Sequence, residues 1–279
     1  MKHILSIFLL LFCASCTSLF YQPDAYFYSD PKALKLDYQE IQIPSFDGTQ
    51  LALWSFKSEK KIEKKCLILF FHGNAQNVSS HYYNLAWIVP QGHDFMILDY
   101  RGYGVSEGKP NPLAVRGDAQ AFLNYGYEQF KKGPYQKLVV YGQSLGGNIL
   151  LDALKEFKHQ DEIALAVFDS TFLSYQELAR DKLKKAIITY PLNWMAYLLI
   201  SDETAAEAYA PQFKRPSLIV HGDNDRVIPL KFGEEFYEKI GAEHKWFWKV
   251  EGGGHIDIFA RSPMNEAYKT KFLVMLESL

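Results

Sequence analysis

A serine in a Gly-x-Ser-x-Gly turn is the residue best placed to act as a nucleophile. The turn runs from Gly142 to Gly146 and places Ser144 between an apolar run, residues 138–141, and a helix-forming run from Gly147. A strand that turns sharply into a helix holds its serine in a strained backbone, and glycine is needed where the chain packs closely. The adjacent helix N-terminus favours developing negative charge. Because glycine-rich turns also occur without catalysis, the serine needs partners.

A nucleophilic serine requires a base, and the base requires an orienting acid. Four histidines follow the serine: His159, His221, His244 and His255. We expect His255 to be the base, because it follows three glycines in a loop after the last predicted strand, where an imidazole can swing over the serine. His221 ends a strand before a turn, so a structural hydrogen bond is its expected role.

The acid should come from the loop after the preceding strand. Residues 221–229 read His-Gly-Asp-Asn-Asp-Arg-Val-Ile-Pro and supply two carboxylates, Asp223 and Asp225. Their types and positions alone leave the choice between them open.

A second turn could stabilise the charge that develops on a substrate. An apolar strand, residues 67–71, ends in His72-Gly73-Asn74. A strand-end turn beside the nucleophile can aim its backbone N–H at a substrate oxygen. We therefore expect the amides of Asn74 and Leu145 to form an oxyanion hole, in which one donor contributes about 100- to 1,000-fold in rate. His72 is expected to support that turn.

The elements that must position these residues follow a regular alternation. Apolar runs predict buried strands at 67–71, 95–98, 138–141, 164–168, 217–220 and 245–250. Periodic segments between them predict helices at 79–89, 112–130, 147–156, 230–240 and 263–279. Alternating runs at 38–44 and 50–56 predict a hairpin. Together these patterns predict an α/β fold with a mostly parallel sheet of about eight strands, helices on both faces, and sites at the strands' C-terminal ends. Residues 172–212 are helical in pattern and rich in aromatics, which predicts a cap insertion.

The motifs taken together resemble the α/β-hydrolase superfamily from about residue 40 to the end. They are HGN at 72–74, DYRGYG at 99–104, GQSLGG at 142–147, HGDNDRVIP at 221–229 and GGGH at 252–255. They are most similar to the branch of serine hydrolases with an HGN oxyanion-hole loop, which includes lipid hydrolases, protein depalmitoylases and bacterial proteins of unknown substrate. In that pattern the second aspartate is the acid of the triad. The resemblance therefore implies Asp225 as the acid and leaves Asp223 as a turn former.

The N-terminus predicts export. A basic start, an apolar run from Ile4 to Phe12 and small residues after it are typical of a signal peptide, and the run is too short to span a bilayer, which needs about 20 residues. Ala14-Ser15-Cys16 resembles a bacterial lipobox, although Cys13 stands where that motif usually has leucine. We expect a signal peptide at 1–15, lipidation of Cys16, a tether at 16–37 and a hydrolase domain at 38–279.

Composition excludes several other classes. The chain has 279 residues and a formal net charge of −2, which argues against a nucleic-acid partner. The histidines lack metal-ligand spacing, and no GxGxxG follows the first strand–helix unit, so we expect neither a metal nor a dinucleotide cofactor. Processing before Cys16 would remove Cys13, and lipidation would modify Cys16. Cys66 would then be the single free cysteine, expected in the core, which predicts no intramolecular disulfide.

These features predict a serine hydrolase that cleaves carboxylic, lipid or thioester acyl bonds through an acyl-enzyme on Ser144. A serine aminopeptidase is the alternative enzyme, and a non-catalytic envelope-binding protein on the same fold is the alternative from another class. The expected location is the bacterial cell envelope, either lipid-anchored or secreted. Acyl chain length, physiological substrate and oligomeric state are left open by the residues.

Overall fold

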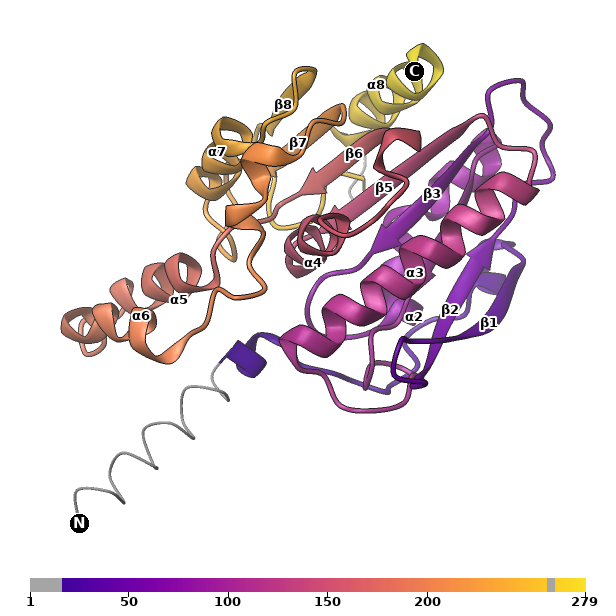
Figure 1. The fold of residues 1–279 in the computed structure, drawn as a ribbon. Coiled ribbons are helices and arrows are strands. Elements are labelled where there is room, and N and C mark those ends of the chain that lie inside the picture. The colour runs from indigo at the N-terminus through magenta and orange to yellow at the C-terminus, as the bar shows by residue number, and fades with distance from the viewer. Residues whose placement is uncertain (1–16, 260–263) are drawn as a thin grey trace.

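The computed structural model describes residues 17–259 and 264–279, in which eight strands form one sheet (Figure 1). The strands are β1 (Tyr38–Pro44), β2 (Gln50–Phe56), β3 (Cys66–Phe71), β4 (Asp94–Leu98), β5 (Lys137–Gln143), β6 (Ile163–Asp169), β7 (Ser217–Gly222) and β8 (Lys245–Val250). They lie in the order β1-β2-β4-β3-β5-β6-β7-β8. Strand β2 is antiparallel to both neighbours, and the remaining pairs are parallel. The predicted hairpin and the predicted mostly parallel sheet are both confirmed.

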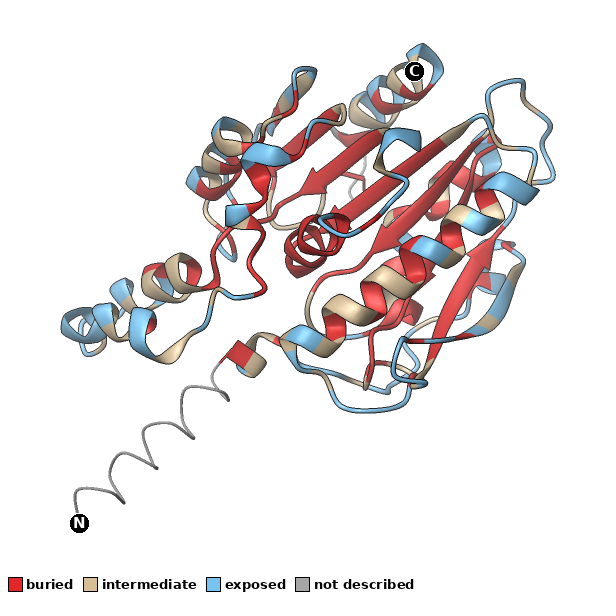
Figure 2. Cartoon of the chain, viewed as in Figure 1, coloured by how far each residue is buried: buried red, intermediate tan, exposed pale blue. Residues whose placement is uncertain are grey.

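Helices cover both faces of this sheet. The helices of the described residues are α2 (Val78–His81), α3 (Pro112–Lys132), α4 (Leu145–Leu154), α5 (Tyr175–Lys184), α6 (Ala196–Leu199), α7 (Leu230–Lys239) and α8 (Met264–Ser278). Helices α3, α4 and α7 contribute to the core on one face, whereas α2 and α8 contribute to the core on the other. Strands β3 and β4 are buried along their whole length, which explains the apolar runs at 66–71 and 95–98 (Figure 2).

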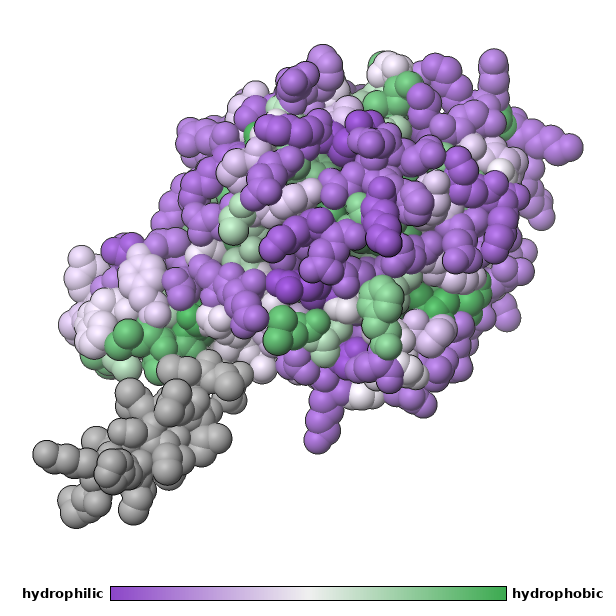
Figure 3. Space-filling view, in the orientation of Figure 1, coloured by the Kyte–Doolittle hydropathy of each residue, from purple (hydrophilic) through white to green (hydrophobic). Residues whose placement is uncertain are grey.

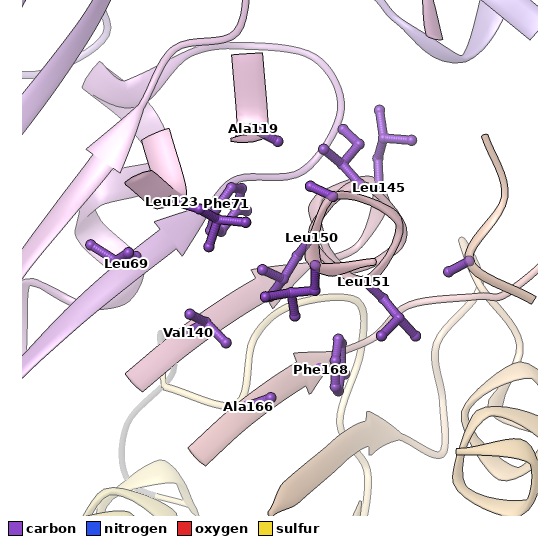
Figure 4. Close-up of a cluster of buried hydrophobic side chains, with 14 of the residues drawn as sticks. Leu69, Phe71, Ala119, Leu123, Val140, Leu145, Leu150, Leu151, Ala166 and Phe168 are labelled. Carbon is purple, nitrogen blue, oxygen red and sulfur yellow. The ribbon is translucent and has the colours of Figure 1, made fainter. Parts of the chain in front are cut away.

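The strand that carries the serine lies in the middle of this core. Figure 4 shows Val140 of β5 among Leu69 and Phe71 of β3 and Leu150 of α4. Each of these side chains is fully buried. Burying a large apolar side chain contributes about 1.5–3 kcal/mol, so the packing holds β5 and α4 in a fixed relation. The turn between them is thereby given a rigid base.

The helical insertion predicted at 172–212 lies between β6 and β7 and holds α5, α6 and several short 3₁₀ turns. It projects from one end of the sheet (Figure 1). We call the part at 172–201 the cap. Its inner residues Phe172 and Tyr175 join the main core, whereas its outer part is mostly exposed (Figure 2).

The single helix predicted at 79–89 is wrong in detail. The segment forms the four-residue helix α2 followed by two 3₁₀ turns, Tyr82–Asn84 and Ala86–Gln91. Leu85 takes φ −115° and ψ 0°, which interrupts the helical ladder. The Asn84 side chain next to it donates a hydrogen bond of 2.8 Å to Gln143 Oε1, so this segment is tied to the end of β5.

Residues 17–37, predicted as part of a tether, pack against the domain. The Phe20 and Tyr175 rings meet edge to face at 5.1 Å, and the Tyr21 and Tyr175 hydroxyls are hydrogen-bonded at 3.1 Å. The Asn77 side chain donates to the backbone carbonyls of Asp24 and Tyr26. Buried aromatic surface and satisfied backbone groups therefore order a segment whose composition suggests a linker.

The predicted signal peptide and Cys16 lie outside the described residues. Within residues 17–259 and 264–279, the model has no helix of the length and apolar character that crossing a bilayer would require.

Candidate active site

The turn after β5 holds Ser144 in a strained conformation. Ser144 has φ 54° and ψ −123°, a left-handed geometry that costs a residue other than glycine about 1–3 kcal/mol. The turn is also tight, because a Cβ at Gly146 would lie 2.2 Å from the carbonyl oxygen of Phe71. A Cβ at Gly142 would lie 2.6 Å from the Cα of Gly147. The glycines are therefore required by backbone contacts, as the motif predicts.

Ser144, His255 and Asp225 form a hydrogen-bonded chain. His255 Nε2 lies 3.0 Å from Ser144 Oγ, and His255 Nδ1 lies 2.7 Å from Asp225 Oδ2. An ionised carboxylate can only accept, so Nδ1 carries the proton and the lone pair of Nε2 faces the serine hydroxyl. The three residues come from the loops after β5, β7 and β8, which the parallel sheet brings to one edge. The structure thus brings together all three residues predicted from the sequence.

Hydrogen bonds keep the carboxyl group of Asp225 ionised. Burial would raise the pKa of its carboxyl, but hydrogen bonds with His255 and with two backbone amides outweigh burial and leave that pKa below its ordinary value. The two amides, of Val227 and Ile228, each donate to Oδ1 at 2.8 Å. Because Oδ1 is held by the backbone, Oδ2 is free to orient His255.

The other carboxylate and histidine of this loop have structural contacts. Asp223 Oδ1 accepts a hydrogen bond of 2.8 Å from the Gly252 amide, which joins the loop after β7 to the loop after β8. His221 is fully buried, and its Nε2 lies 2.8 Å from the carbonyl oxygen of Ile228. Burial lowers the pKa of His221, so its ring stays neutral. Both side chains hold the loop that presents Asp225.

The two amides predicted to form an oxyanion hole lie beside the serine. Among the described residues, neither the Asn74 nor the Leu145 backbone N–H donates to a protein acceptor. Leu145 is the first residue of α4, where helix N–H groups have no intrahelical partner. Gly73 packs so closely that a Cβ there would lie 3.2 Å from Ser144 Cβ. Both donors are therefore next to the nucleophile and available to a ligand.

Buried aromatic side chains hold the HGN turn, residues 72–74, in place. The Tyr100 hydroxyl donates to the carbonyl of His72 at 3.1 Å, and His72 Nδ1 lies 2.7 Å from the carbonyl of Gly73. The His81 ring stacks on His72 at 4.9 Å, and its Nε2 lies 3.1 Å from the carbonyl of Ala75. Burial, with the proximity of His72, lowers the pKa of His81 to about 3. The two stacked rings support the turn.

A buried polar network, not predicted from the sequence, lies under the turn at 142–146, which we call the elbow. Asp169, at the end of β6, accepts hydrogen bonds from the Tyr141 hydroxyl and the Gln143 side chain at 2.7 and 3.0 Å. Burial raises the pKa of Asp169. Its carbonyl accepts from the Ser144 amide at 2.8 Å, and Thr171 Oγ1 donates to the Ser144 carbonyl at 2.6 Å. The run Asp-Ser-Thr directly after a buried strand was the available signal.

Ser144 lies on an apolar pocket of about 500 Å³ between the cap, the N-terminal segment and the loop after β7. The lining residues are Leu19, Phe20, Gln22, Asn74, Ser144, Leu145, Phe172, Leu178, Ala179, Lys182, Leu183, Ala196, Leu199, Ile200, Val227 and Ile228. The side chains of Gln22, Asn74, Ser144 and Lys182 supply the polar groups. The N-terminal segment therefore contributes to the pocket, which its prediction as a tether did not anticipate. The backbone N–H of Gln22 in this segment donates to Asn74 Oδ1 at 2.8 Å, so the N-terminal segment also holds the HGN turn.

Within the part of the chain that the structure describes, no group of three or more His, Cys, Asp or Glu residues is placed to hold a metal ion. The free thiol of Cys66 is buried at the start of β3, and burial raises its pKa to about 12. That cysteine is a core residue, as the sequence analysis expected.

The sheet order, the elbow after β5 and the loops that meet at one sheet edge define an α/β-hydrolase fold. A family model described as serine aminopeptidase, S33, matches residues 62–201, and the chain belongs to this family. The protein YfhR of Escherichia coli (strain K12) is 29% identical to this chain over 267 residues, which cover 93% of this chain and 88% of that protein. The α/β-hydrolase domain-containing protein WAV2 of Arabidopsis thaliana is 30% identical, over 81% of this chain and 75% of that protein.

A solved structure agrees with the fold. The esterase Pf2001 of Pyrococcus furiosus superposes with a TM-score of 0.68 at 20% identity, over 93% of this chain and 97% of that chain. Fold and family together make the protein a hydrolase.

Proposed function

We propose that this hydrolase is a serine esterase that transfers an acyl group from a carboxylic ester, lipid ester or thioester to Ser144. The hydrogen-bonded chain Ser144–His255–Asp225 at the mouth of an apolar pocket carries this proposal. A base within 3.0 Å of the hydroxyl and a carboxylate on the far side of that base are the geometry that nucleophilic catalysis requires.

The reaction follows from the hydrogen-bond directions. His255 Nε2 accepts the Ser144 proton as Oγ attacks the acyl carbon, and the Asn74 and Leu145 amides donate to the resulting oxyanion. As the tetrahedral intermediate collapses, the bond to the leaving alcohol or thiol breaks and His255 returns the proton to it. Water then repeats these steps on the acyl-enzyme, which releases a carboxylic acid and restores the serine. Asp225 stabilises the imidazolium in both halves.

The walls of the pocket favour an apolar acyl group. Twelve of its sixteen lining residues are Leu, Ile, Val, Phe or Ala. Burying an acyl methylene against such walls contributes about 0.8 kcal/mol, so longer chains should bind more tightly until the pocket is full. A thioester would bind in the same way, because its acyl part is the same.

The family description raises aminopeptidase activity as an alternative. An aminopeptidase must hold a free α-ammonium group near its nucleophile, which calls for a carboxylate in the pocket. Among the described pocket-lining residues there is no Asp or Glu, and the charged one is Lys182. A lysine repels an ammonium group, so the pocket favours an ester over a peptide with a free N-terminus.

A non-catalytic binding protein on this fold is the other alternative. Such a protein would need neither a strained serine nor two amides left without protein acceptors beside it. Those features have a cost in folding stability, which supports catalysis as their reason.

The decisive test compares Ser144→Ala with Ser278→Ala, a serine in the C-terminal helix. We expect wild type and S278A to react with a fluorophosphonate probe and hydrolyse p-nitrophenyl butyrate, and S144A to lose about six orders of magnitude in kcat. More than a few per cent of residual activity in S144A would remove Ser144 as the nucleophile. An unlabelled wild type would favour the binding protein, and faster hydrolysis of leucine p-nitroanilide than of the ester would favour the aminopeptidase.

We further propose that the chain is processed before Cys16, lipidated on that residue and held in the bacterial cell envelope. The basic start, the apolar run and Ala14-Ser15-Cys16 support this location. Metabolic palmitate labelling should mark wild type and leave Cys16→Ser unlabelled as a longer precursor. Equal labelling of the two would contradict lipidation at Cys16.

A further inference from the structure

An exposed apolar surface covers the outer part of the cap. Within eight residues, five large side chains are each at least 46% exposed: Ile187, Ile188, Tyr190, Leu192 and Trp194. Ile187 and Ile188 are 92% and 87% exposed, which is close to the limit for a side chain in solution. In Figure 3 hydrophobic side chains gather over the part of the molecule that holds α5 and α6. Large contiguous apolar patches mark interaction sites, so this surface, residues 187–194 of the cap, needs an occupant.

We propose that the occupant is a lipid bilayer, and that this cap surface docks on the membrane with the pocket mouth facing the lipid. The contact between Thr17, the first described residue, and the cap supports this choice. Thr17 is hydrogen-bonded to Ser201 just beyond α6, because the Ser201 amide donates to Thr17 Oγ1 at 2.8 Å. Cys16 is joined to Thr17 by one peptide unit of about 3.8 Å between Cα atoms. The proposed site of lipid attachment is thus bonded directly to a residue that contacts the cap.

Charge and residue type agree with a bilayer. Lys184 and Lys185 precede the apolar surface with one residue, Ala186, between, and both are exposed. Lys185 Nζ also lies 3.2 Å from Asp181 Oδ2, so Lys184 is the cation without that ion pair. Cations beside an apolar face favour membranes with anionic lipids. Tyrosine and tryptophan suit the headgroup region because they combine an apolar ring with a polar group, and the cap surface offers Tyr190 and Trp194.

The segments that flank the cap surface in the sequence, together with the N-terminal segment, also line the pocket. Leu19, which is 71% exposed, lines the pocket, and so does Leu183 from the end of α5. Leu199 and Ile200, which follow the cap surface in the sequence, line it too. An acyl chain leaving a bilayer against residues 187–194 would therefore pass along apolar side chains toward Ser144. Docking would spare that chain a passage through water.

The test uses the full chain reconstituted into vesicles of phosphatidylethanolamine and phosphatidylglycerol, with or without brominated acyl chains that quench nearby tryptophan. We expect brominated lipid to quench part of the fluorescence, Trp194→Phe to remove that quenching, and Trp246→Phe to keep it. Trp246 is the matched control because it is also exposed, at 39%, but lies near the start of β8, whereas the cap follows the C-terminal end of the parallel strand β6. Unchanged quenching in W194F would overturn the proposal, since the protein would then be anchored without docking its cap.

A second pair of variants removes the apolar surface without touching the pocket. Ile187→Ser with Ile188→Ser should abolish the quenching of Trp194, whereas Val274→Ser, an exposed valine of α8, should not. If the double variant instead separates a dimer in detergent and leaves quenching unchanged, the surface binds a second copy and the proposal fails.

Docking of the cap rests in part on the proposed anchor, but the quenching of Trp194 does not depend on hydrolysis. Fluorophosphonate labelling of the same samples keeps the two proposals apart. Labelled protein without Trp194 quenching would overturn docking alone, and quenched but unlabelled protein would overturn the esterase alone.

Discussion

The two sides of the pocket are built on different principles. On the sheet side, Ser144 and Asp225 are 6% and 7% exposed. The Ser144 amide donates to the carbonyl of Asp169, and Asp225 accepts from the Val227 and Ile228 amides of its own loop. On the cap side, the walls are apolar and come from short helices and 3₁₀ turns. The sheet side thus fixes atoms to within fractions of an ångström, as bond-making requires. The cap side offers surface without directional contacts, which suits a variable apolar group.

This difference implies different sensitivities to mutation. A buried hydrogen-bonded group leaves an unsatisfied partner when it is replaced, whereas an apolar wall can adjust to a change of shape. Substitutions on the sheet side should therefore change rate or folding strongly. Those on the cap side should mainly change which substrate is preferred.

After the loss of Ser144 itself, the largest effect is expected at the carboxylate behind His255. Asp225→Asn keeps the shape but places an amide where Oδ2 accepts the proton of His255 Nδ1, so it favours the wrong tautomer. The loss in kcat should be about 10⁴-fold. Asp223→Asn is the matched control, because Asn can still accept from the Gly252 amide, and it should lose less than about tenfold. Measured kcat on p-nitrophenyl butyrate decides, and a larger loss at 223 would move the acid to that position.

A smaller effect is expected in the pH dependence of stability. The pKa of His81 is lowered to about 3 by burial and by His72, against an ordinary value of about 6.5 in the unfolded chain. Between these values the unfolded state binds a proton that the folded state does not, so the stability contribution is complete above pH 6.5 and is lost as pH falls. From pH 7 to pH 5 this one histidine should lower the free energy of unfolding by about 2 kcal/mol.

Two variants isolate that contribution. His81→Gln and His81→Phe both remove the titrating ring, one polar and one apolar, so their stabilities at pH 7 should differ from each other. Urea unfolding at pH 7 and pH 5 should nevertheless show a smaller loss in both variants than in wild type. If all three proteins lost the same free energy, the burial of a neutral His81 under the HGN turn would be refuted.

The same contrast explains what the sequence could predict. The sheet, its hairpin and Ser144 were predictable, because strand periodicity is local and the glycines at 142 and 146 follow from backbone contacts of the turn. His255 followed from its place after the last strand, whereas Asp225 was implied only by the resemblance to a known family. Asp223 and Asp225 could not be separated by residue type. Their different contacts, with Gly252 and with His255, depend on where the loop after β8 returns.

Other features depended on long-range packing. Residues 17–37 have the composition of a linker, yet Phe20 and Tyr21 find aromatic partners about 150 residues away along the chain. The support of the elbow by Asp169 and Thr171 requires β6 to lie beside β5, which no local pattern states. The exposure of Ile187 and Ile188 could not be anticipated, because apolar residues in a helical pattern predict a buried face.

The smallest effect expected is a change in acyl-chain preference when the cap wall is enlarged. Leu183 is half-buried and lines the pocket, so Leu183→Trp should occupy space that a long acyl chain needs. Lys184→Trp adds the same ring at the next, exposed position and is the matched control. On soluble p-nitrophenyl esters, kcat/KM for the longest chain should fall about tenfold in L183W, or about 1.4 kcal/mol, and that for acetate should stay within about twofold. An equal fall for acetate and for the long ester would place Leu183 among the groups that govern the chemical step, and the division between the two sides of the pocket would not hold.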